Sequence, residues 1–93
     1  MEPDYEKYEK KFKEIMDNCF EIFKQKNMEY KASFFIRQNK LNKGLYEMER
    51  KYDRIVANLN SNPPNLSIVS REFDDWIIFG IMEKIVVDEE KTT

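Results

Sequence analysis

The stretch SREFDDWIIFGIMEKI, residues 70–85, decides the fold. Residues 76–82 are apolar nearly all round, and no segment of the chain alternates polar and apolar residues as a half-buried strand does. We therefore expect residues 70–85 to form the central, most buried helix of an all-α protein. Ser67 or Ser70 would cap this helix, because a serine hydroxyl accepts a hydrogen bond from the first turn.

Two further long helices are predicted on the N-terminal side of this segment. The first begins at Pro3 and Asp4 and runs for about six turns, and the second runs from Leu41 to Leu59. Each has apolar side chains at the spacing of an amphipathic helix. The two apolar stripes are Tyr5, Tyr8, Phe12, Ile15, Cys19, Ile22 and Phe23 in the first helix, and Leu45, Met48, Tyr52, Ile55, Val56 and Leu59 in the second. We expect both stripes to pack in the core, with a partner-binding ridge as the alternative for the first.

These segments predict an antiparallel bundle of three to four helices in a single domain that spans residues 1–93. A short apolar turn or helix at residues 32–37 is the optional fourth member. Residues 60–66 contain two prolines and three asparagines, which cannot continue a helix, so we expect an inter-helix loop there. Residues 88–93 are expected to fray into solvent.

Composition limits the classes of function that remain. A chain of 93 residues builds a core that stabilises one domain only modestly, which favours a homodimer. With no histidine and one cysteine, the chain lacks the residues for histidine-based catalysis or an internal disulfide. Cys19, inside an apolar stripe, is expected to be a buried structural thiol. The net charge of −2 gives no general basic surface for nucleic acid.

The compartment follows from the same observations. The N-terminal segment is charged throughout, unlike a signal peptide, and no apolar run reaches the roughly 20 residues of a membrane span. A single cysteine is typical of a protein without disulfides. We therefore expect a cytoplasmic protein.

Four carboxylates on the last two predicted helices offer the one route from this sequence to chemistry. Glu49 and Asp53 are four residues apart and Glu72 and Asp75 are three apart, so each pair lies on one side of its helix. If the helices pack together, the four groups could converge on Mg²⁺, which prefers carboxylate oxygens completed by water and substrate phosphates. Glu47 falls on the other border of its helix's apolar stripe.

Two structural roles compete with metal binding. Glu49 and Asp53 could pair with neighbouring basic groups such as Arg54. Glu72 and Asp75, near the predicted start of the last helix, could instead offset the positive end of the helix dipole. The distance between the two carboxylate pairs distinguishes these roles from a shared metal site.

Three segments, in order along the chain, resemble the nucleotide modification associated domain family. They are FKQKNMEYKASFF at 23–35, which contains a K-N-x-x-Y pattern, the helix ending ERKYDRIVANL at 49–59, with a K-x-x-R pattern, and EFDDWIIFGIMEKI at 72–85, where acidic residues precede an apolar run. The resemblance covers about residues 23–85. That family is similar in turn to the MazG-like all-α NTP pyrophosphohydrolases, which have the acidic motifs E-x-x-E and E-x-x-D.

The resemblance implies a MazG-like fold and a nucleotide-binding function. In such an enzyme, Mg²⁺ held by the four carboxylates would assist hydrolysis of a nucleoside triphosphate to the monophosphate and pyrophosphate. Lys26, Asn27 and Tyr30 would lie near the base or the sugar, and Arg54 would contact a phosphate. MazG-like sites are commonly assembled between subunits, which again implies a homodimer.

A non-enzymatic interaction protein is the alternative. A compact, acidic, aromatic-rich helical domain of this size suits an inhibitor or adaptor, for example from a mobile element, that covers a basic surface of a host or defence protein. Residues 88–90 and the charges of the first helix would then bind the partner. The third possibility is a structural helical dimer whose interface is the aromatic stripe of the first helix.

Overall fold

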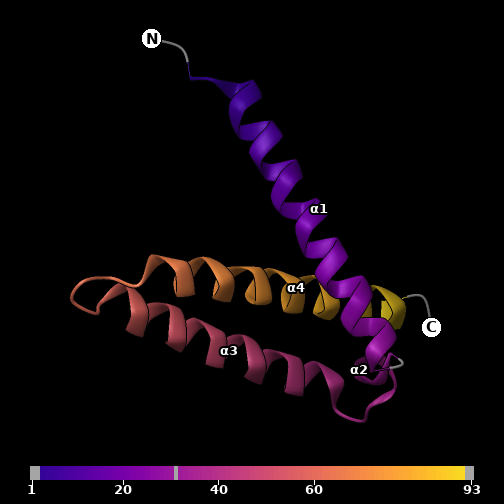
Figure 1. The fold of residues 1–93 in the computed structure, drawn as a ribbon. Coiled ribbons are helices and arrows are strands. Elements are labelled where there is room, and N and C mark those ends of the chain that lie inside the picture. Colours follow the sequence, from indigo (N-terminus) through magenta and orange to yellow (C-terminus); the bar gives the residue numbers. More distant parts are fainter. Residues whose placement is uncertain (1–2, 31, 92–93) are drawn as a thin grey trace.

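Figure 1 shows the computed structural model, which describes residues 3–30 and 32–91. Within these ranges the chain forms four helices and no strand: α1 (Tyr5–Glu29), α2 (Ser33–Ile36), α3 (Lys40–Leu59) and α4 (Leu66–Lys91). The all-α fold predicted from the sequence is confirmed. Among the described residues, no helix combines the length and the apolar character needed to cross a membrane.

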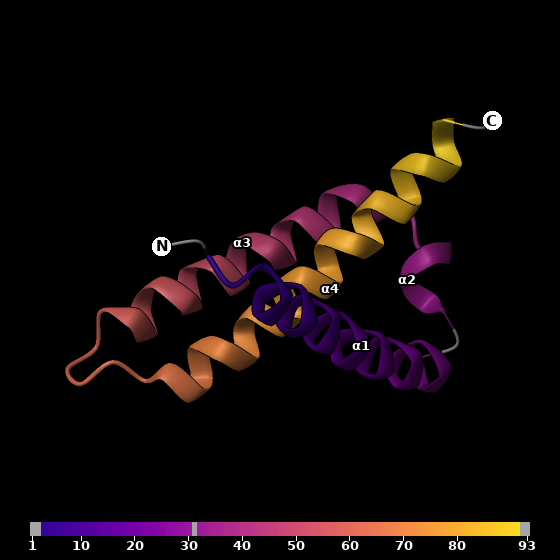
Figure 2. The same cartoon turned by 90° about the horizontal axis from the view of Figure 1, so that it is seen from above.

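Helices α3 and α4 form an antiparallel hairpin, and α4 is the central element because α1 also packs against it. Figure 2, the view from above, shows α1 crossing over α4 while α3 runs alongside. The two facing rows have the alternating spacings of four and three that helical pairs use. These buried or half-buried residues are Gly44, Met48, Lys51, Ile55 and Asn58 on α3, and Val69, Glu72, Trp76, Phe79, Glu83 and Val86 on α4.

The apolar core is small. In the described part of the chain, the buried apolar residues are Cys19, Ile55, Val69 and Val86, of which Cys19 and Val86 are fully buried. Residues 76–82, predicted to be the most buried segment, are half-buried or exposed instead. The prediction of burial was wrong because only two long helices of the described chain, α1 and α3, pack against α4. They cannot cover a segment that is apolar nearly all round.

The apolar stripe of α1 is covered along only half of its length. The second half of α1 meets α4, and there Cys19 is buried while Ile22 and Phe23 are half-buried. The first half projects away from the other helices (Figure 1), so the prediction of core packing is wrong for this part. Its exposed apolar side chains are Tyr5, Tyr8, Phe12 and Ile15.

The buried face of α3 is rotated away from the predicted stripe. Of the stripe residues, Ile55 is buried and Met48 is half-buried. The exposed ones are Leu45, Tyr52, Val56 and Leu59. The reason is that Gly44 and Lys51, neither of them a hydrophobic core residue, face α4: Gly44 lies against Glu83, and Lys51 forms ion pairs with α4.

Both ends of α4 differ from the prediction. In the structure, the loop predicted at residues 60–66 ends at Asn65, and α4 begins at Leu66. The side-chain Oδ1 of Asn65 accepts a hydrogen bond from the Ile68 backbone N–H at 3.3 Å. Asn65, rather than Ser67 or Ser70, is therefore the cap, and asparagine suits this position as well as serine does. At the other end α4 continues to Lys91, so residues 88–91 are helical rather than frayed, and residues 92–93 lie outside the described ranges.

Candidate functional site

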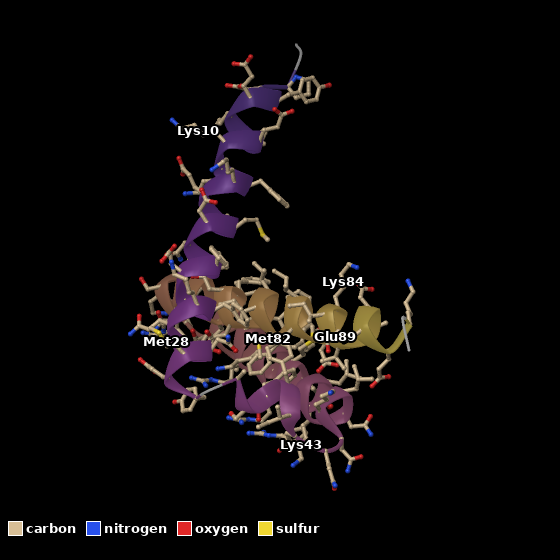
Figure 3. All side chains as sticks on the ribbon, turned by 90° about the vertical axis from the view of Figure 1, so that its right-hand side faces the viewer. Lys10, Met28, Lys43, Met82, Lys84 and Glu89 are labelled. Carbon is tan, nitrogen blue, oxygen red and sulfur yellow. The ribbon has the colours of Figure 1, made fainter. Side chains whose placement is uncertain are left out.

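A cavity of about 320 Å³ lies where the C-terminal end of α1, helix α2, the start of α3 and the middle of α4 meet. Ligand pockets typically begin near 300 Å³, so this cavity is large enough for a small molecule. Its lining residues are Ile22, Phe23, Lys26, Asn27, Tyr30, Ala32, Ser33, Phe34, Arg37, Lys43, Glu47, Asp75, Ile78, Phe79 and Met82. Figure 3 looks onto this end of the molecule, with Met82 in its crowded centre and Lys43 at its outer edge.

Helix α2 is held over the cavity by its flanking turns and by aromatic contacts. Ala32 and Asn39, on either side of α2, both have left-handed backbone conformations, with φ of 57° and 56°, so the chain turns sharply before and after it. The Phe34 ring meets Phe35 and Phe79 edge to face, with centroids 5.3 and 6.3 Å apart. Each such pair contributes about 0.5–1.5 kcal/mol beyond its burial. The Phe34–Phe79 pair attaches α2 to α4 and gives the cavity an aromatic wall.

Three basic side chains on the cavity wall have no acidic partner. Lys26, Arg37 and Lys43 line the cavity, and none of them forms an ion pair with any residue that the structure describes. All three are exposed at the cavity rim. Their charges are therefore available to an anionic ligand.

The two carboxylates on the same wall are already neutralised by cations outside the lining. Arg50 Nη1 lies 3.0 Å from Glu47 Oε1, and Lys51 Nζ lies 3.1 Å from Asp75 Oδ2. Neither carboxylate therefore cancels the three basic groups of the cavity. The wall as a whole is positive, although the chain has a net charge of −2.

The structure brings together three of the four side chains that were predicted to bind substrate. Lys26 and Tyr30, which are one turn apart near the end of α1, line the cavity with Asn27 between them in sequence. Arg54 does not join them, because it lies on α3 with its Nη2 atom 2.9 Å from Glu72 Oε1. Arg54 therefore binds a carboxylate of its own chain.

The four predicted metal ligands do not gather at one point. Glu49 and Asp53 are exposed on α3 and do not line the cavity, whereas Asp75 does. Glu72 is buried in the seam between α3 and α4. Among the described residues, no group of three or more aspartate, glutamate or cysteine side chains is placed to hold a metal ion.

Glu72 and Asp75 are instead held by the two basic residues of the K-x-x-R segment. Lys51 Nζ donates a hydrogen bond to Asp75 and lies 3.3 Å from Glu72 Oε2, while Arg54 pairs with Oε1 of the same carboxylate. The Lys51 ammonium donates its hydrogen bond to Asp75. Glu72 Oε2 therefore has an electrostatic interaction with Lys51 but no hydrogen bond within the described chain. Two of the short sequence motifs therefore contact each other directly.

This ion-pair network, rather than the helix dipole, explains the positions of Glu72 and Asp75. Because α4 begins at Leu66, Glu72 and Asp75 lie beyond its first turn, which contains no acidic residue. The dipole effect falls off within the first turn, so it does not account for their position. Glu72 is 3% exposed, and a buried carboxylate of this kind requires the cations of Lys51 and Arg54.

Cys19 has the structural role predicted for it. Its thiol is 2% exposed and its Sγ lies 3.8 Å from Asp74 Oδ1. Burial, followed by the negative charge of Asp74, raises the pKa of Cys19 above its ordinary value. The thiol form is therefore favoured, and the residue is a poor nucleophile.

Arg37 and Lys43 were missed in the sequence, although a signal for them is present. Residues 30–46 contain no aspartate or glutamate, in a chain where these residues number 18, and the segment carries several basic residues. An acid-free basic segment in an acidic chain indicates a local anion-binding surface. Glu47 was placed on the far border of its helix, yet it reaches the cavity because α3 is rotated from the predicted orientation.

Comparison with known proteins identifies no relative of this chain. No protein-family model, no curated protein and no solved structure matches the chain.

Proposed function

We propose that this chain is a nucleotide-binding domain, related to the nucleotide modification associated and MazG-like families, that holds the phosphates of a nucleoside triphosphate in the cavity under α2. The observation that carries the proposal is the set of three basic side chains without ion-pair partners among the described residues. They lie on a wall whose two carboxylates are paired with Arg50 and Lys51 and whose remaining residues are mostly apolar or aromatic. Phosphate is the ligand that such a set binds most strongly, and an aromatic wall suits a base.

Five polar residues of the cavity have a role in this proposal. Arg37 offers a planar fork that matches two phosphate oxygens, whereas Lys26 and Lys43 act as point charges. The Asn27 amide, both donor and acceptor, would bind the edge of the base or a sugar hydroxyl. Tyr30, with 62% of its surface exposed, would cover the base from the rim.

The carboxylates do not fit the resident Mg²⁺ centre that the family resemblance implies. Glu72 and Asp75 share the charge of Lys51, so a divalent ion would have to displace an ammonium group from a largely buried position. Glu49 and Asp53 lie on the exposed side of α3. The activity we propose is therefore binding, and Mg²⁺ would accompany the phosphates of the ligand.

A homodimer also belongs to this proposal. The small apolar core supports it, because a second copy would bury surface that one chain leaves exposed. The three basic residues of the cavity lie within one chain, so we expect a single copy to bind the nucleotide.

Isothermal titration calorimetry tests the proposal with ATP, inorganic triphosphate and adenosine as probes. We expect ATP and triphosphate to bind and adenosine alone to bind far more weakly. The double substitution Arg37→Gln with Lys43→Gln should weaken ATP binding by about tenfold or more per charge, since a hydrogen bond to a charged group contributes about 1.5–3 kcal/mol. The matched control, Lys10→Gln with Lys13→Gln on the projecting half of α1, removes the same charge. Equal affinity in the two double variants, or no binding of ATP, would contradict the proposal.

A further inference from the structure

The projecting half of α1 carries a row of large apolar side chains that no other part of the described chain covers. Tyr5, Tyr8 and Phe12 are 65%, 64% and 69% exposed, and Ile15 continues the row one turn further along. In Figure 3, Lys10 marks the part of α1 that stands clear of the other helices. A single helix in this position has no neighbour to bury its apolar face.

A groove runs beside this row, in the angle between α1 and the first half of α4. Its apolar residues are Ile15 of α1 and Leu66, Val69, Phe73 and Ile77 of α4. Leu66 and Phe73 are 65% and 40% exposed. Ile15 belongs both to the row and to the groove, so the two adjoin, and we term them together the α1 face. The polar residues that flank the apolar ones in the groove are Lys11, Glu14, Asn18, Ser70 and Asp74.

The α1 face supplies most of the area that a dimer requires. Taking about 200 Å² for a whole aromatic side chain, the three aromatic residues of α1 leave roughly 400 Å² exposed, and the groove residues raise the total to roughly 600 Å². This is the upper end of what monomers expose, at about 300–600 Å². A stable complex needs about 800 Å² per partner, which the aliphatic stems of the flanking lysines would supply.

We propose that the α1 face docks a second copy of this chain, with the projecting half of each α1 lying antiparallel against the other in the groove beside α4. An antiparallel pair centred on the row sets Tyr5 of one copy against Ile15 of the other, and Tyr8 against Phe12. Residues at heptad positions a and d face each other in this arrangement, and the spacings of three, four and three along the row supply them.

A second copy fits this surface better than an unrelated partner does, because the ridge and the groove lie side by side on one chain. In a two-fold pair, the ridge of each copy enters the groove of the other, so both unpartnered features are buried at once. The pair is also closed, which leaves no further apolar ridge for a third chain.

The test is the mass of the full-length protein in solution, measured by sedimentation equilibrium from micromolar to millimolar concentration. Wild type should be dimeric. Tyr8→Lys with Phe12→Lys should weaken dimerisation by about 100-fold or more, as loss of two central aromatic anchors does. Asp17→Lys changes the net charge by the same amount on the polar face of α1, and this control should remain dimeric. Phe12→Gln, a milder change, should give an intermediate dissociation constant.

Folding and nucleotide binding are measured on the same samples. Circular dichroism and Trp76 fluorescence should show that the hairpin is intact in the double variant, because the substituted side chains touch neither α3 nor α4. ATP binding should persist in the monomeric variant, so loss of the dimer and loss of the proposed nucleotide site are separate outcomes. A monomeric wild type at every concentration, or a double variant as dimeric as the control, would overturn the proposal.

Discussion

Replacing Glu83 by glutamine is expected to stabilise the protein at neutral pH. The Glu83 side chain is 7% exposed in the seam between α3 and α4, and its Oε1 atom has no hydrogen-bond partner among the described residues. It lies against the backbone of Gly44, where a Cβ atom would overlap with it. This burial raises the pKa of Glu83 above its ordinary value of 4.5.

The magnitude follows from the charge alone, because glutamine leaves an uncharged polar group in the same place; an unpaired buried polar group costs about 1–3 kcal/mol, and more when it is charged. Glutamine keeps the shape of the side chain and removes the charge, so we expect a gain of about 1–2 kcal/mol in the free energy of unfolding. In a domain of this size that gain corresponds to an increase of roughly 5–15 °C in Tm.

The pH dependence gives the sharper test. Because the folded-state pKa of Glu83 is raised, its contribution to stability is fully present below pH 4.5 and is lost as the pH rises through the folded-state pKa. Urea unfolding, followed by circular dichroism at a series of pH values above 4.5, should show that the free energy of unfolding falls less steeply with pH in Glu83→Gln than in wild type. Glu49→Gln, which neutralises an exposed carboxylate on α3, is the matched control and should leave the slope unchanged. A Glu83→Gln protein that is less stable than wild type at neutral pH, with the same slope, would refute the reasoning.

Three further predictions test the seam and the helix ends. Lys51→Met should destabilise the protein by about 3 kcal/mol in urea unfolding, because it leaves Glu72 and Asp75 with less compensation; a loss below about 1 kcal/mol would show that the network is not important for stability. Asn65→Ala should cost about 1 kcal/mol and Asn65→Ser very little, since a serine can still cap α4; equal costs would argue against the cap. Mg²⁺ without nucleotide should leave Tm unchanged in a thermal melt, because Lys51 and Arg54 already neutralise the acidic pair, and a rise in Tm that Glu72→Gln abolishes would contradict this.

Helix positions could be predicted from local pattern, whereas the faces that the helices bury could not. Periodicity and the polar loop at residues 60–65 place the long helices correctly. The buried face of α3 depends on Gly44 and Lys51, and hydropathy assigns neither of them to a core. For the first half of α1 the sequence favoured core packing and left a partner-binding ridge as the alternative, because an apolar stripe predicts a neighbour without indicating where that neighbour lies.

The candidate site was predictable where it lies on one helix and hidden where it depends on a turn. Lys26 and Tyr30 are one turn apart at the C-terminal end of α1, so the short K-N-x-x-Y pattern identifies both. Arg37 and Lys43 reach the same cavity only because Ala32 and Asn39 adopt left-handed conformations around α2. Asparagine adopts the left-handed conformation more readily than most residues, so Asn39 is a weak signal of the second turn, whereas Ala32 gives no signal of the first.

The most direct test of the proposed nucleotide site is to map it by NMR on the isotope-labelled protein during titration with ATP. We expect the largest chemical-shift changes on Lys26, Arg37 and Lys43 and on the ring of Tyr30, while Glu49 on the exposed side of α3 stays unchanged. Largest changes on that exposed side of α3, or no changes at saturating ATP, would contradict it.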